Sequence, residues 1–308
     1  MRVFVTGGYG FLGSHVTRAL EARGVDVRRA THYEYDLTNL YEVEEMILDA
    51  RPNVIVHCAA FVGGIDLNVA EPGRMMFDNL RMGMNVVEQA RRHGVKRVVL
   101  IGTACSYPAT ENRVKWDDAP LQEDELLWGP PAAETRAYGV AKLTLLELAR
   151  AYRAQYGTRF DYLIPTNLYG PGDNFDLKTG HVIPSMIVKF GQKRNTKSAV
   201  TLYGDGTQTR DFLYVEDAAH AIGKAAEQGT NGEPINLGSG SETSIREVAE
   251  ILSELSGGVR FDFDGSKPVG TQRRLLDTAR AKEELGWMAN TELRDGLEQT
   301  VNWYRGRR

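Results

Sequence analysis

Cysteine is the scarcest residue in this 308-residue chain, which contains only Cys58 and Cys105. Two cysteines cannot build the disulfide network of a small secreted protein. A chain of this length also buries enough apolar surface to fold without one. Each cysteine is therefore expected to be a free thiol.

Long apolar runs are missing as well. No stretch approaches the roughly 20 residues that cross a bilayer. Met1 leads directly into the apolar residues 3–5, without the basic region and long apolar core of a signal peptide. We therefore expect a cytoplasmic protein that does not associate with a membrane.

An excess of basic charge is the third absence. Lys and Arg number 37 against 41 for Asp and Glu, so the net charge is −4, and 42% of the residues are hydrophobic. This balance is ordinary for a folded globular protein, and it argues against disorder and against binding to a nucleic-acid backbone. No metal site is predicted.

What the sequence does contain is a regular alternation of short β-branched runs and helix-period stretches. This pattern predicts an α/β fold, a Rossmann-type doubly wound parallel sheet with a smaller, mixed α/β C-terminal lobe. The expected strands are 2–6, 25–29, 53–57, 97–101 and 161–165; the expected helices are 11–23, 40–50, 75–93, 138–156, 183–191, 216–228 and 244–255.

The same pattern predicts the domain organisation. Residues 1–167 are expected to form a dinucleotide-binding domain, and segments near 211–238 are expected to rejoin its sheet. Residues 168–308 should then form mainly a substrate-binding lobe. No flexible linker separates the two parts.

A glycine-rich loop follows the first expected strand and opens the first helix. Gly7 suits a tight turn, Gly10 allows close approach of a pyrophosphate, and Gly13 permits close packing of the helix. The spacing resembles that of the short-chain dehydrogenase/reductase superfamily, in its extended, nucleotide-sugar-modifying branch. A purely structural turn is the alternative.

The end of the second strand bears on the choice of cofactor. Arg28 and Arg29 stand where a carboxylate would accept the ribose 2′-hydroxyl of NAD, and a guanidinium attracts a 2′-phosphate instead. NADP is therefore favoured, with NAD as the other candidate and two solvated arginines as the alternative. Asp36 and Leu37 stand where this branch contacts adenine, although they could simply form a helix-capping turn.

A tyrosine and a lysine stand four residues apart on an expected helix, at Tyr138 and Lys142. A nearby ammonium is expected to lower the pKa of the phenol. Thr103 lies 35 residues before the tyrosine, at the end of the fourth strand. The three resemble the Ser/Thr, Tyr, Lys triad of the superfamily, against the alternative of a surface Tyr and Lys on an ordinary helix.

Further motifs follow in order along nearly the whole chain and resemble the GDP-L-fucose synthase family, whose members are epimerase-reductases. The motif around His181 is the most specific of them. They occupy residues 59–65, 102–108, 165–171, 173–175, 181–184, 206–212, 267–268, 275–277 and 285–287.

The resemblance implies that Cys105 and His181 exchange protons at sugar carbons beside a ketone. Thiols and imidazoles titrate close enough to neutrality to act as base and acid. A small buried cysteine and a histidine that only caps a helix are the alternatives. Cys58 is assigned to packing.

The resemblance also implies the ligand contacts. Cofactor contacts are expected at Gly7, Gly10, Phe11, Leu12, Gly13, Arg29, Asp36, Leu37, Ala59, Lys142, Pro165, Asn167 and Leu168. Substrate contacts are expected at Asn167, Lys189, Tyr203, Arg210 and Arg274.

Four positions depart from the family pattern. Tyr9 replaces a basic residue, Lys189 an arginine, Tyr203 a tryptophan and Val269 an acidic residue. A lysine keeps the charge but loses the fork of a guanidinium, and valine cannot accept hydrogen bonds from a base. These departures leave the sugar and the nucleotide base open.

The leading hypothesis is NADPH-dependent epimerisation at C3 and C5 and reduction at C4 of GDP-4-keto-6-deoxy-D-mannose to GDP-L-fucose. A related 4-keto nucleotide sugar, including a heptose, is a second possible substrate. The competing enzyme is an NAD-retaining epimerase resembling GDP-mannose 3,5-epimerase, and a different class is a non-catalytic dinucleotide-sensing scaffold. The resemblance further implies a homodimer formed through helices 75–93 and 138–156, unless these helices merely cover the sheet.

Overall fold

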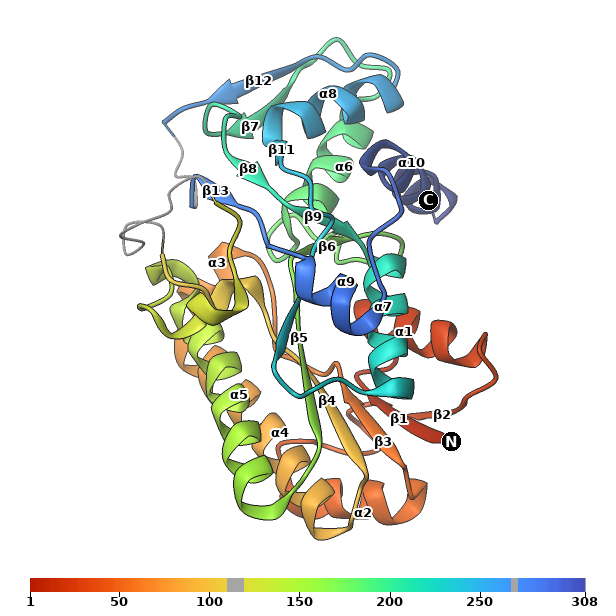
Figure 1. Cartoon of the computed structure of the whole chain (residues 1–308). Helices are drawn as coiled ribbons and strands as arrows, with labels where there is room; N and C mark the ends of the chain where they lie inside the picture. The colour runs from red at the N-terminus through yellow and green to blue at the C-terminus, as the bar shows by residue number, and fades with distance from the viewer. Residues whose placement is uncertain (110–118, 267–270, 308) are drawn as a thin grey trace.

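The fold is organised around a six-stranded parallel sheet with the order β2-β1-β3-β4-β5-β10 (Figure 1). The computed structural model describes residues 1–109, 119–266 and 271–307. The strands are β1 (Arg2–Thr6), β2 (Asp26–Arg29), β3 (Val54–His57), β4 (Arg97–Ile101), β5 (Phe160–Pro165) and β10 (Pro234–Leu237).

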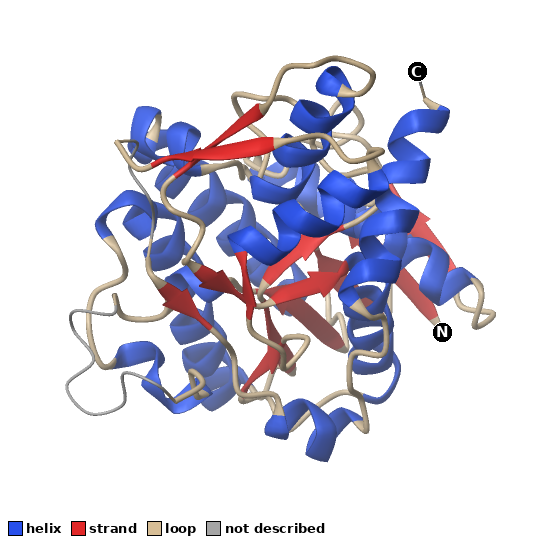
Figure 2. Ribbon diagram, turned by 90° about the horizontal axis from the view of Figure 1, so that it is seen from above, coloured by secondary structure: helices blue, strands red, loops and turns tan. Residues whose placement is uncertain are grey.

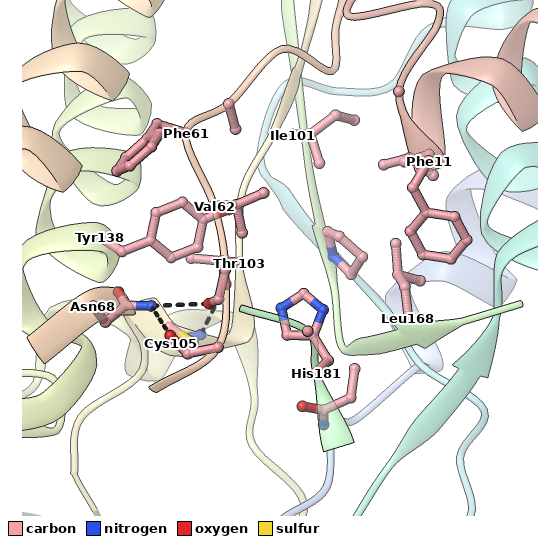
Figure 3. Close-up of a pocket in the computed structure, with 18 of the residues that line it drawn as sticks. Phe11, Phe61, Val62, Asn68, Ile101, Thr103, Cys105, Tyr138, Leu168 and His181 are labelled. Carbon is pink, nitrogen blue, oxygen red and sulfur yellow. Dashed lines mark hydrogen bonds between the residues drawn. The ribbon is translucent and has the colours of Figure 1, made fainter. Parts of the chain in front are cut away.

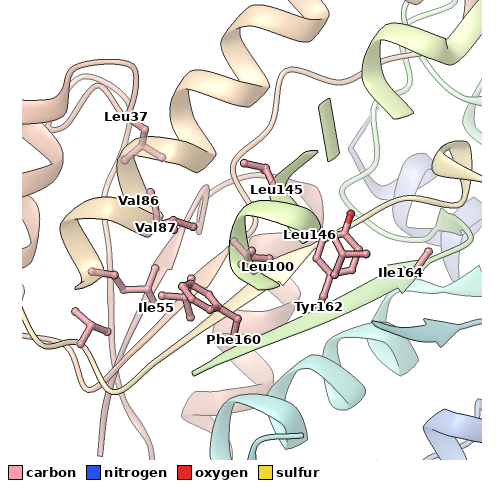
Figure 4. Packing of buried hydrophobic residues seen from close by; sticks show 14 of the residues in the cluster. Leu37, Ile55, Val86, Val87, Leu100, Leu145, Leu146, Phe160, Tyr162 and Ile164 are labelled. Atoms are coloured by element: carbon pink, nitrogen blue, oxygen red, sulfur yellow. The ribbon is translucent and has the colours of Figure 1, made fainter. Parts of the chain in front are cut away.

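Alternate residues of each central strand enter two different cores, because successive side chains of a strand point to opposite faces. In β4, Val98 and Leu100 face one core while Val99 and Ile101 face the other. Figure 4 shows the first of these cores, where Phe160 meets side chains from neighbouring helices. This two-sided burial explains why the strands read as continuous apolar runs.

Helices cover both faces of the sheet (Figure 2). One face carries α2 (Leu40–Ala50), α4 (Pro72–Arg92) and α5 (Arg136–Tyr156). The other face carries α1 (Phe11–Glu21), α7 (Val215–Gln228) and α9 (Ala279–Leu285). No helix in the described part of the chain is long and apolar enough to cross a membrane.

The strand order reverses between β1 and β3, so the helices that follow these strands lie on opposite faces. Such a switch point leaves a crevice outside the carboxyl ends of the strands, where ligands bind in open α/β sheets. A short helix, α3 (Ile65–Ala70), and a 3₁₀ turn, η1 (Ala104–Ser106), follow β3 and β4 at this edge.

A second lobe has its own core and lies beyond the carboxyl edge of the sheet (Figure 1). Its helices are α6 (Val182–Lys193), α8 (Ile245–Leu255) and α10 (Leu293–Gly306). Its small sheets pair β7 (Val200–Tyr203) with β12 (Phe261–Asp264), β6 (Asn167–Tyr169) with β9 (Phe212–Tyr214), and β8 (Thr209–Arg210) with both β11 (Thr243–Ser244) and β13 (Arg273–Arg274).

The predicted fold class is confirmed, and each of the five expected strands lies within one residue of its observed bounds. Within the segment near 211–238, β10 pairs with β5 in the central sheet and β9 pairs with β6 instead. The short strands of the second lobe and helices α3, α9 and α10 were not expected. Strands of two to four residues are too short to show a period.

Helix α5 and turn η1 are locked together at Gly139. A Cβ at this position would overlap the carbonyl oxygen of Cys105, so only glycine allows this approach. The Ser106 hydroxyl donates a hydrogen bond of 2.9 Å to the Gly139 carbonyl. The contact therefore sets the separation between the end of β4 and the first turn of α5.

The Gly139→Ala substitution tests this lock. The added methyl should push α5 away from η1 and lower the free energy of unfolding by about 1–3 kcal/mol, the usual scale for overpacking. Gly73→Ala is the matched control, because Gly73 is also helical and a Cβ there meets nothing within 4 Å. Denaturant unfolding should show Gly73→Ala to be neutral or slightly stabilising, and equal effects of the two substitutions would contradict the lock.

Candidate active site

One cavity of about 1420 Å³ opens at the carboxyl edge of the sheet and extends into the second lobe. It is larger than the usual range of 300–1,000 Å³ for a drug-sized ligand, so it has room for two ligands. Figure 3 shows part of its wall, with Thr103, Cys105 and Tyr138 near one another and His181 close by. Of all the site residues predicted from the sequence, only Arg29 does not line it.

The glycine loop forms one end of the cavity. Gly7 adopts φ +64°, and its carbonyl accepts a hydrogen bond of 2.9 Å from the Gly10 amide. A Cβ at Gly13 would overlap the Gly7 carbonyl, so both positions require glycine. Helix α1 begins immediately after Gly10 and has no acidic side chain in its first turn. This end of the cavity therefore fits a pyrophosphate.

The two arginines of β2 have different surroundings. Arg28 pairs with Asp26, and its Nε lies 3.4 Å from that carboxylate. The Arg29 guanidinium stacks on the ring of Tyr9, 4.5 Å from its centroid, and Tyr9 lines the cavity. Arg29 thus brings a cation to the edge of the glycine loop, where Tyr9 itself carries no charge.

Asp36 and Leu37 line the cavity, and the helix-capping alternative is also partly realised. Asp36 Oδ1 accepts hydrogen bonds from the amide and the hydroxyl of Thr38. The N-cap of α2 is Asn39, whose side chain accepts from the Tyr41 amide. Asp36 therefore stabilises the turn before the N-cap, and Leu37 lines the cavity beside it.

Thr103, Tyr138 and Lys142 meet in the wall between the two ends of the cavity. The Thr103 hydroxyl accepts a hydrogen bond of 3.1 Å from the Cys105 amide. The Lys142 ammonium lies 5.9 Å from the centroid of the Tyr138 ring. The four-residue spacing thus brings tyrosine and lysine to one side of α5, facing the end of β4.

The expectation that Lys142 lowers the pKa of Tyr138 is not met. Burial raises the pKa of the Tyr138 phenol above its ordinary value, with the Cys105 thiolate as a smaller cause. Burial also lowers the pKa of Lys142 to about 8. Burial therefore shifts the proton equilibrium of each group toward its uncharged form. A phenol that keeps its proton suits an acid rather than a base.

Cys105 lies in the cavity wall on η1, and Cys58 lies nearby after β3. The Cys105 sulfur accepts a long hydrogen bond of 3.6 Å from the Arg274 guanidinium. Burial raises the pKa of the Cys58 thiol to about 12, which keeps that thiol protonated. Within the described residues, the guanidinium contact distinguishes Cys105 from Cys58.

His181 occupies the N-cap position of α6, yet its side chain makes no capping hydrogen bond. The alternative in which this histidine only caps a helix therefore lacks its defining contact. The imidazole lines the cavity and is 44% exposed. Its Nδ1 lies 4.0 Å from Oδ1 of the buried Asp173.

The far end of the cavity is cationic. Arg210 and Arg274 lie opposite each other on paired strands β8 and β13, and burial followed by the charge of Arg274 lowers the pKa of Arg210 to about 10. In the described ranges, neither guanidinium has a carboxylate partner. Nearby, the Lys189 ammonium lies 4.9 Å from the Tyr203 ring centroid. Such a pair of arginines can bind a diphosphate.

The strand ends at Pro165, Asn167 and Leu168 line the middle of the cavity. The Asn167 amide donates a hydrogen bond of 3.0 Å to the Asp211 carbonyl, which fixes the orientation of the side chain. Val269 lies outside the described residues, as do Lys267 and Pro268.

Sequence reasoning missed several lining residues, including Gln208 and Asn68. Gln208 is buried beside the strand that carries Arg210. Asn68 belongs to the short helix α3, which was not expected. A single polar residue in a loop carries no periodic signal, so only a comparison of sequences could have found them.

Comparisons with known proteins agree with this geometry. A model described as the NAD dependent epimerase/dehydratase family matches residues 3–238. A GDP-L-fucose synthase of Sinorhizobium fredii is 39% identical over 302 residues, covering 97% of this chain and 94% of that protein.

Two solved structures are similar over the whole chain. A GDP-6-OMe-4-keto-L-xylo-heptose reductase from Campylobacter jejuni has a TM-score of 0.91 at 26% identity, covering 100% of this chain and 98% of that one. A GDP-L-fucose synthetase from Naegleria fowleri bound to NADP has a TM-score of 0.88 at 26% identity, covering 99% and 94%.

Burial of Lys142 predicts a pH-dependent cost to stability. Its pKa is lowered from 10.5 to about 8, so below pH 8 both states hold the proton and the folded protein bears the full cost. Between about pH 8 and 10.5 only the unfolded chain keeps the Lys142 proton, so the cost to folding falls progressively toward zero as the pH rises. Lys142→Met should therefore raise the free energy of unfolding by about 3 kcal/mol at pH 7 and by much less at pH 10.

Denaturant unfolding at the two pH values measures this difference. Lys96→Met is the control, because Lys96 is exposed, and it should change little at either pH. A Lys142→Met variant no more stable than the parent at pH 7 would contradict the assigned cost.

Proposed function

The chain belongs to the NAD dependent epimerase/dehydratase family, and we propose that it epimerises C3 and C5 and reduces C4 of GDP-4-keto-6-deoxy-D-mannose with NADPH, forming GDP-L-fucose. The relatives named GDP-L-fucose synthase and GDP-heptose reductase support an epimerase-reductase of GDP-sugars. A closely related GDP-linked 4-keto sugar is the alternative substrate.

One observation carries the proposal. A single cavity is lined by Tyr138 and Lys142, by Cys105 and by His181, between a glycine loop and two arginines. Reduction of a ketone needs a pair such as Tyr138 and Lys142. An epimerase beside a ketone also needs a base and an acid near the adjacent carbons, and the same cavity supplies both sets.

Reduction uses the residues of α5 and the end of β4. NADPH, when bound along the glycine loop, supplies the hydride for C4. Tyr138 donates its proton to the C4 oxygen, and its raised pKa keeps that proton in place until the oxygen becomes basic. Thr103 hydrogen-bonds the same oxygen, and Lys142 holds the nicotinamide ribose.

Epimerisation precedes reduction, because the protons beside C4 are acidic only while C4 is a ketone. Cys105 and His181 remove a proton from C3 or C5 and return one to the opposite face. The enolate oxygen formed in between is stabilised by hydrogen bonds from Thr103 and Tyr138. The Arg274 guanidinium donates a hydrogen bond to the Cys105 sulfur, so a cation lies beside the thiol that exchanges these protons.

The second lobe, mainly residues 168–308, binds the GDP portion. Arg210 and Arg274 neutralise the diphosphate, while Lys189 and Tyr203 face the nucleoside. Residues 1–167 hold the cofactor, and α7 and β10 pack with them around the central sheet. Asn167 lies between the two and contacts both ligands.

Two other functions make different predictions. An epimerase that retains NAD would leave the cofactor unchanged after each turnover, whereas the proposed reaction consumes one NADPH per product. A scaffold that only senses a dinucleotide would need neither Cys105 nor His181. The presence of both in the cavity favours an enzyme.

We also propose that the chain works as a homodimer in the cytosol. Helix α4 leaves Phe77 and Met84 exposed at 59% and 43%, seven residues apart on one side of the helix. Tyr156 of the adjacent α5 is exposed as well. A twofold axis through these helices would bury the three apolar side chains. Both cysteines are unpaired, which suits a reducing compartment.

The different surroundings of Arg28 and Arg29 predict which one selects the cofactor. Arg29→Ala should weaken NADPH binding about tenfold or more and leave NADH binding unchanged, since it removes a cation that pairs with the 2′-phosphate. Arg28→Ala is the matched control and should alter neither, because Arg28 pairs with Asp26. Titration calorimetry gives the four affinities, and an equal loss for both cofactors in Arg29→Ala would refute this role.

The reaction itself is tested in heavy water with GDP-4-keto-6-deoxy-D-mannose and NADPH. We expect one NADPH consumed per GDP-L-fucose formed, with deuterium at C3 and C5 by NMR. Cys105→Ser should still bind NADPH and reduce some substrate, but its product should be the unepimerised sugar with much less deuterium.

Two results would contradict the proposal. Product formation without net oxidation of NADPH would indicate a cofactor-retaining epimerase. Undiminished deuterium at both carbons in Cys105→Ser would leave Cys105 as a packing residue beside a reductase site.

A further inference from the structure

The loop that precedes α6 brings a buried carboxylate to His181. We propose that Asp173 is a positioning residue for His181, which orients the imidazole and stabilises its protonated form during epimerisation. This inference rests on the proposed function and adds a residue to which neither the motifs nor the ligand contacts assign a role.

Asp173 and His181 lie at the two ends of one loop. Asp173 Oδ1 is 4.0 Å from His181 Nδ1, and the two side chains are 2% and 44% exposed. The carboxylate is thus hidden behind the imidazole, and the imidazole lines the cavity, whereas Asp173 does not. Asp173 can act on a substrate only through His181.

The loop between them is held in shape by its own bonds. Asp176 Oδ1 accepts hydrogen bonds of 2.9 Å from the backbone amides of Lys178 and Thr179. A Cβ at Gly180 would overlap the carbonyl oxygens of Asn174 and Asp176. The loop therefore closes tightly and fixes where His181 begins α6.

Phe175 anchors the same loop to the second lobe. Its ring stacks on Tyr304 of α10, with the ring centroids 4.7 Å apart. The position of Asp173 relative to His181 is therefore set on both sides, by the turn and by the anchor. A preset geometry of this kind reduces the entropy lost when the pair forms.

Asp173 has few partners apart from His181. Asp173 Oδ1 accepts a hydrogen bond of 2.7 Å from the Asn174 amide. Its Oδ2 is buried without a hydrogen-bond partner in the described part of the chain. A buried carboxylate with one donor is costly unless a cation lies nearby. His181 is its only ion-pairing partner among the described residues.

The helix end at His181 opposes a positive charge on the imidazole. It stands at the N-terminus of α6, where the helix dipole disfavours a cation. Asp173 is the carboxylate that pairs with this imidazole among the described residues, so it opposes the effect of the helix end.

The proposed step at His181 transfers one proton and needs no other reactant. With Nδ1–H directed at Asp173, the Nε2 lone pair is free to face the sugar. When Nε2 takes the proton from the C–H bond, the electron pair of that bond enters the enolate, and the ring becomes an imidazolium beside the carboxylate. Shortening the gap by about 1 Å would give a charge-assisted hydrogen bond.

A double-mutant cycle tests the inference. Asp173→Asn should lower the rate of epimerisation roughly 10-fold to 100-fold in the parent, the scale seen when the partner that orients a metal-bound histidine is removed. It should leave KM and NADPH affinity unchanged, because Asp173 touches neither ligand. In a His181→Gln background the same substitution should change the residual rate less than twofold, since the group it acts through is gone.

Asp161→Asn is the matched control. Asp161 of β5 is likewise buried, leaves Oδ2 without a hydrogen bond and lies 3.5 Å from a cation, Arg97. It does not line the cavity. Its effect on the rate should be small and the same in both backgrounds.

Each outcome decides the matter. Equal losses in both backgrounds, or no loss in the parent, would overturn the inference and leave the proposed function standing. A parent that neither epimerises nor consumes NADPH would overturn the proposed function and this inference with it. If Asp173→Asn does not fold, Asp173→Ser keeps an acceptor for the Asn174 amide without the charge, and it should show the same pattern.

Discussion

The approach of α5 to the η1 turn is the constraint on which the rest of the site depends. Gly139 lies against the Cys105 carbonyl, so no side chain separates the helix from the turn. The backbone positions that carry Tyr138 and Lys142 on one side, and Thr103 and Cys105 on the other, are therefore fixed relative to each other. Core packing on one face of the sheet supports this contact, since α5 buries Leu145 and Leu146 against the strands.

The same close packing produces the electrostatic character of the site. Lys142 is buried and Tyr138 is packed into the cavity wall, so burial moves both pKa values toward the uncharged forms. At the other end, Arg210 faces Arg274 across paired strands without a carboxylate between them in the described ranges. The protein thus maintains an unfavourable arrangement of charge that an anionic ligand relieves, which is typical of functional sites.

Much of this could be predicted from the sequence, and the limits have physical causes. Strands such as 97–101 and the long helices have clear patterns of apolar residues. The spacing of Gly7 and Gly13 indicates the turn of the glycine loop. The direction of the pKa shift at Tyr138 could not be predicted, because it depends on burial rather than on the neighbour four residues away. Asp173 belonged to a sequence motif, but a role beside His181 could not be predicted, because the loop brings the two side chains together only in the fold. Arg28 and Arg29 both stand where a 2′-phosphate was expected, and only Arg29 was predicted as a cofactor contact. Their partners, Asp26 for Arg28 and the Tyr9 ring for Arg29, come from the fold.

The central claim is that one cavity holds the cofactor and a GDP-sugar at the same time, with the reacting carbons between Tyr138, Cys105 and His181. A crystal structure with NADP and GDP-L-fucose tests this most directly. The account predicts the pyrophosphate of the cofactor on the glycine loop, its nicotinamide beside Tyr138, the diphosphate of the product between Arg210 and Arg274, and its sugar facing Cys105 and His181. A product bound with its sugar outside this group of residues, or a nicotinamide turned away from the sugar, would contradict it.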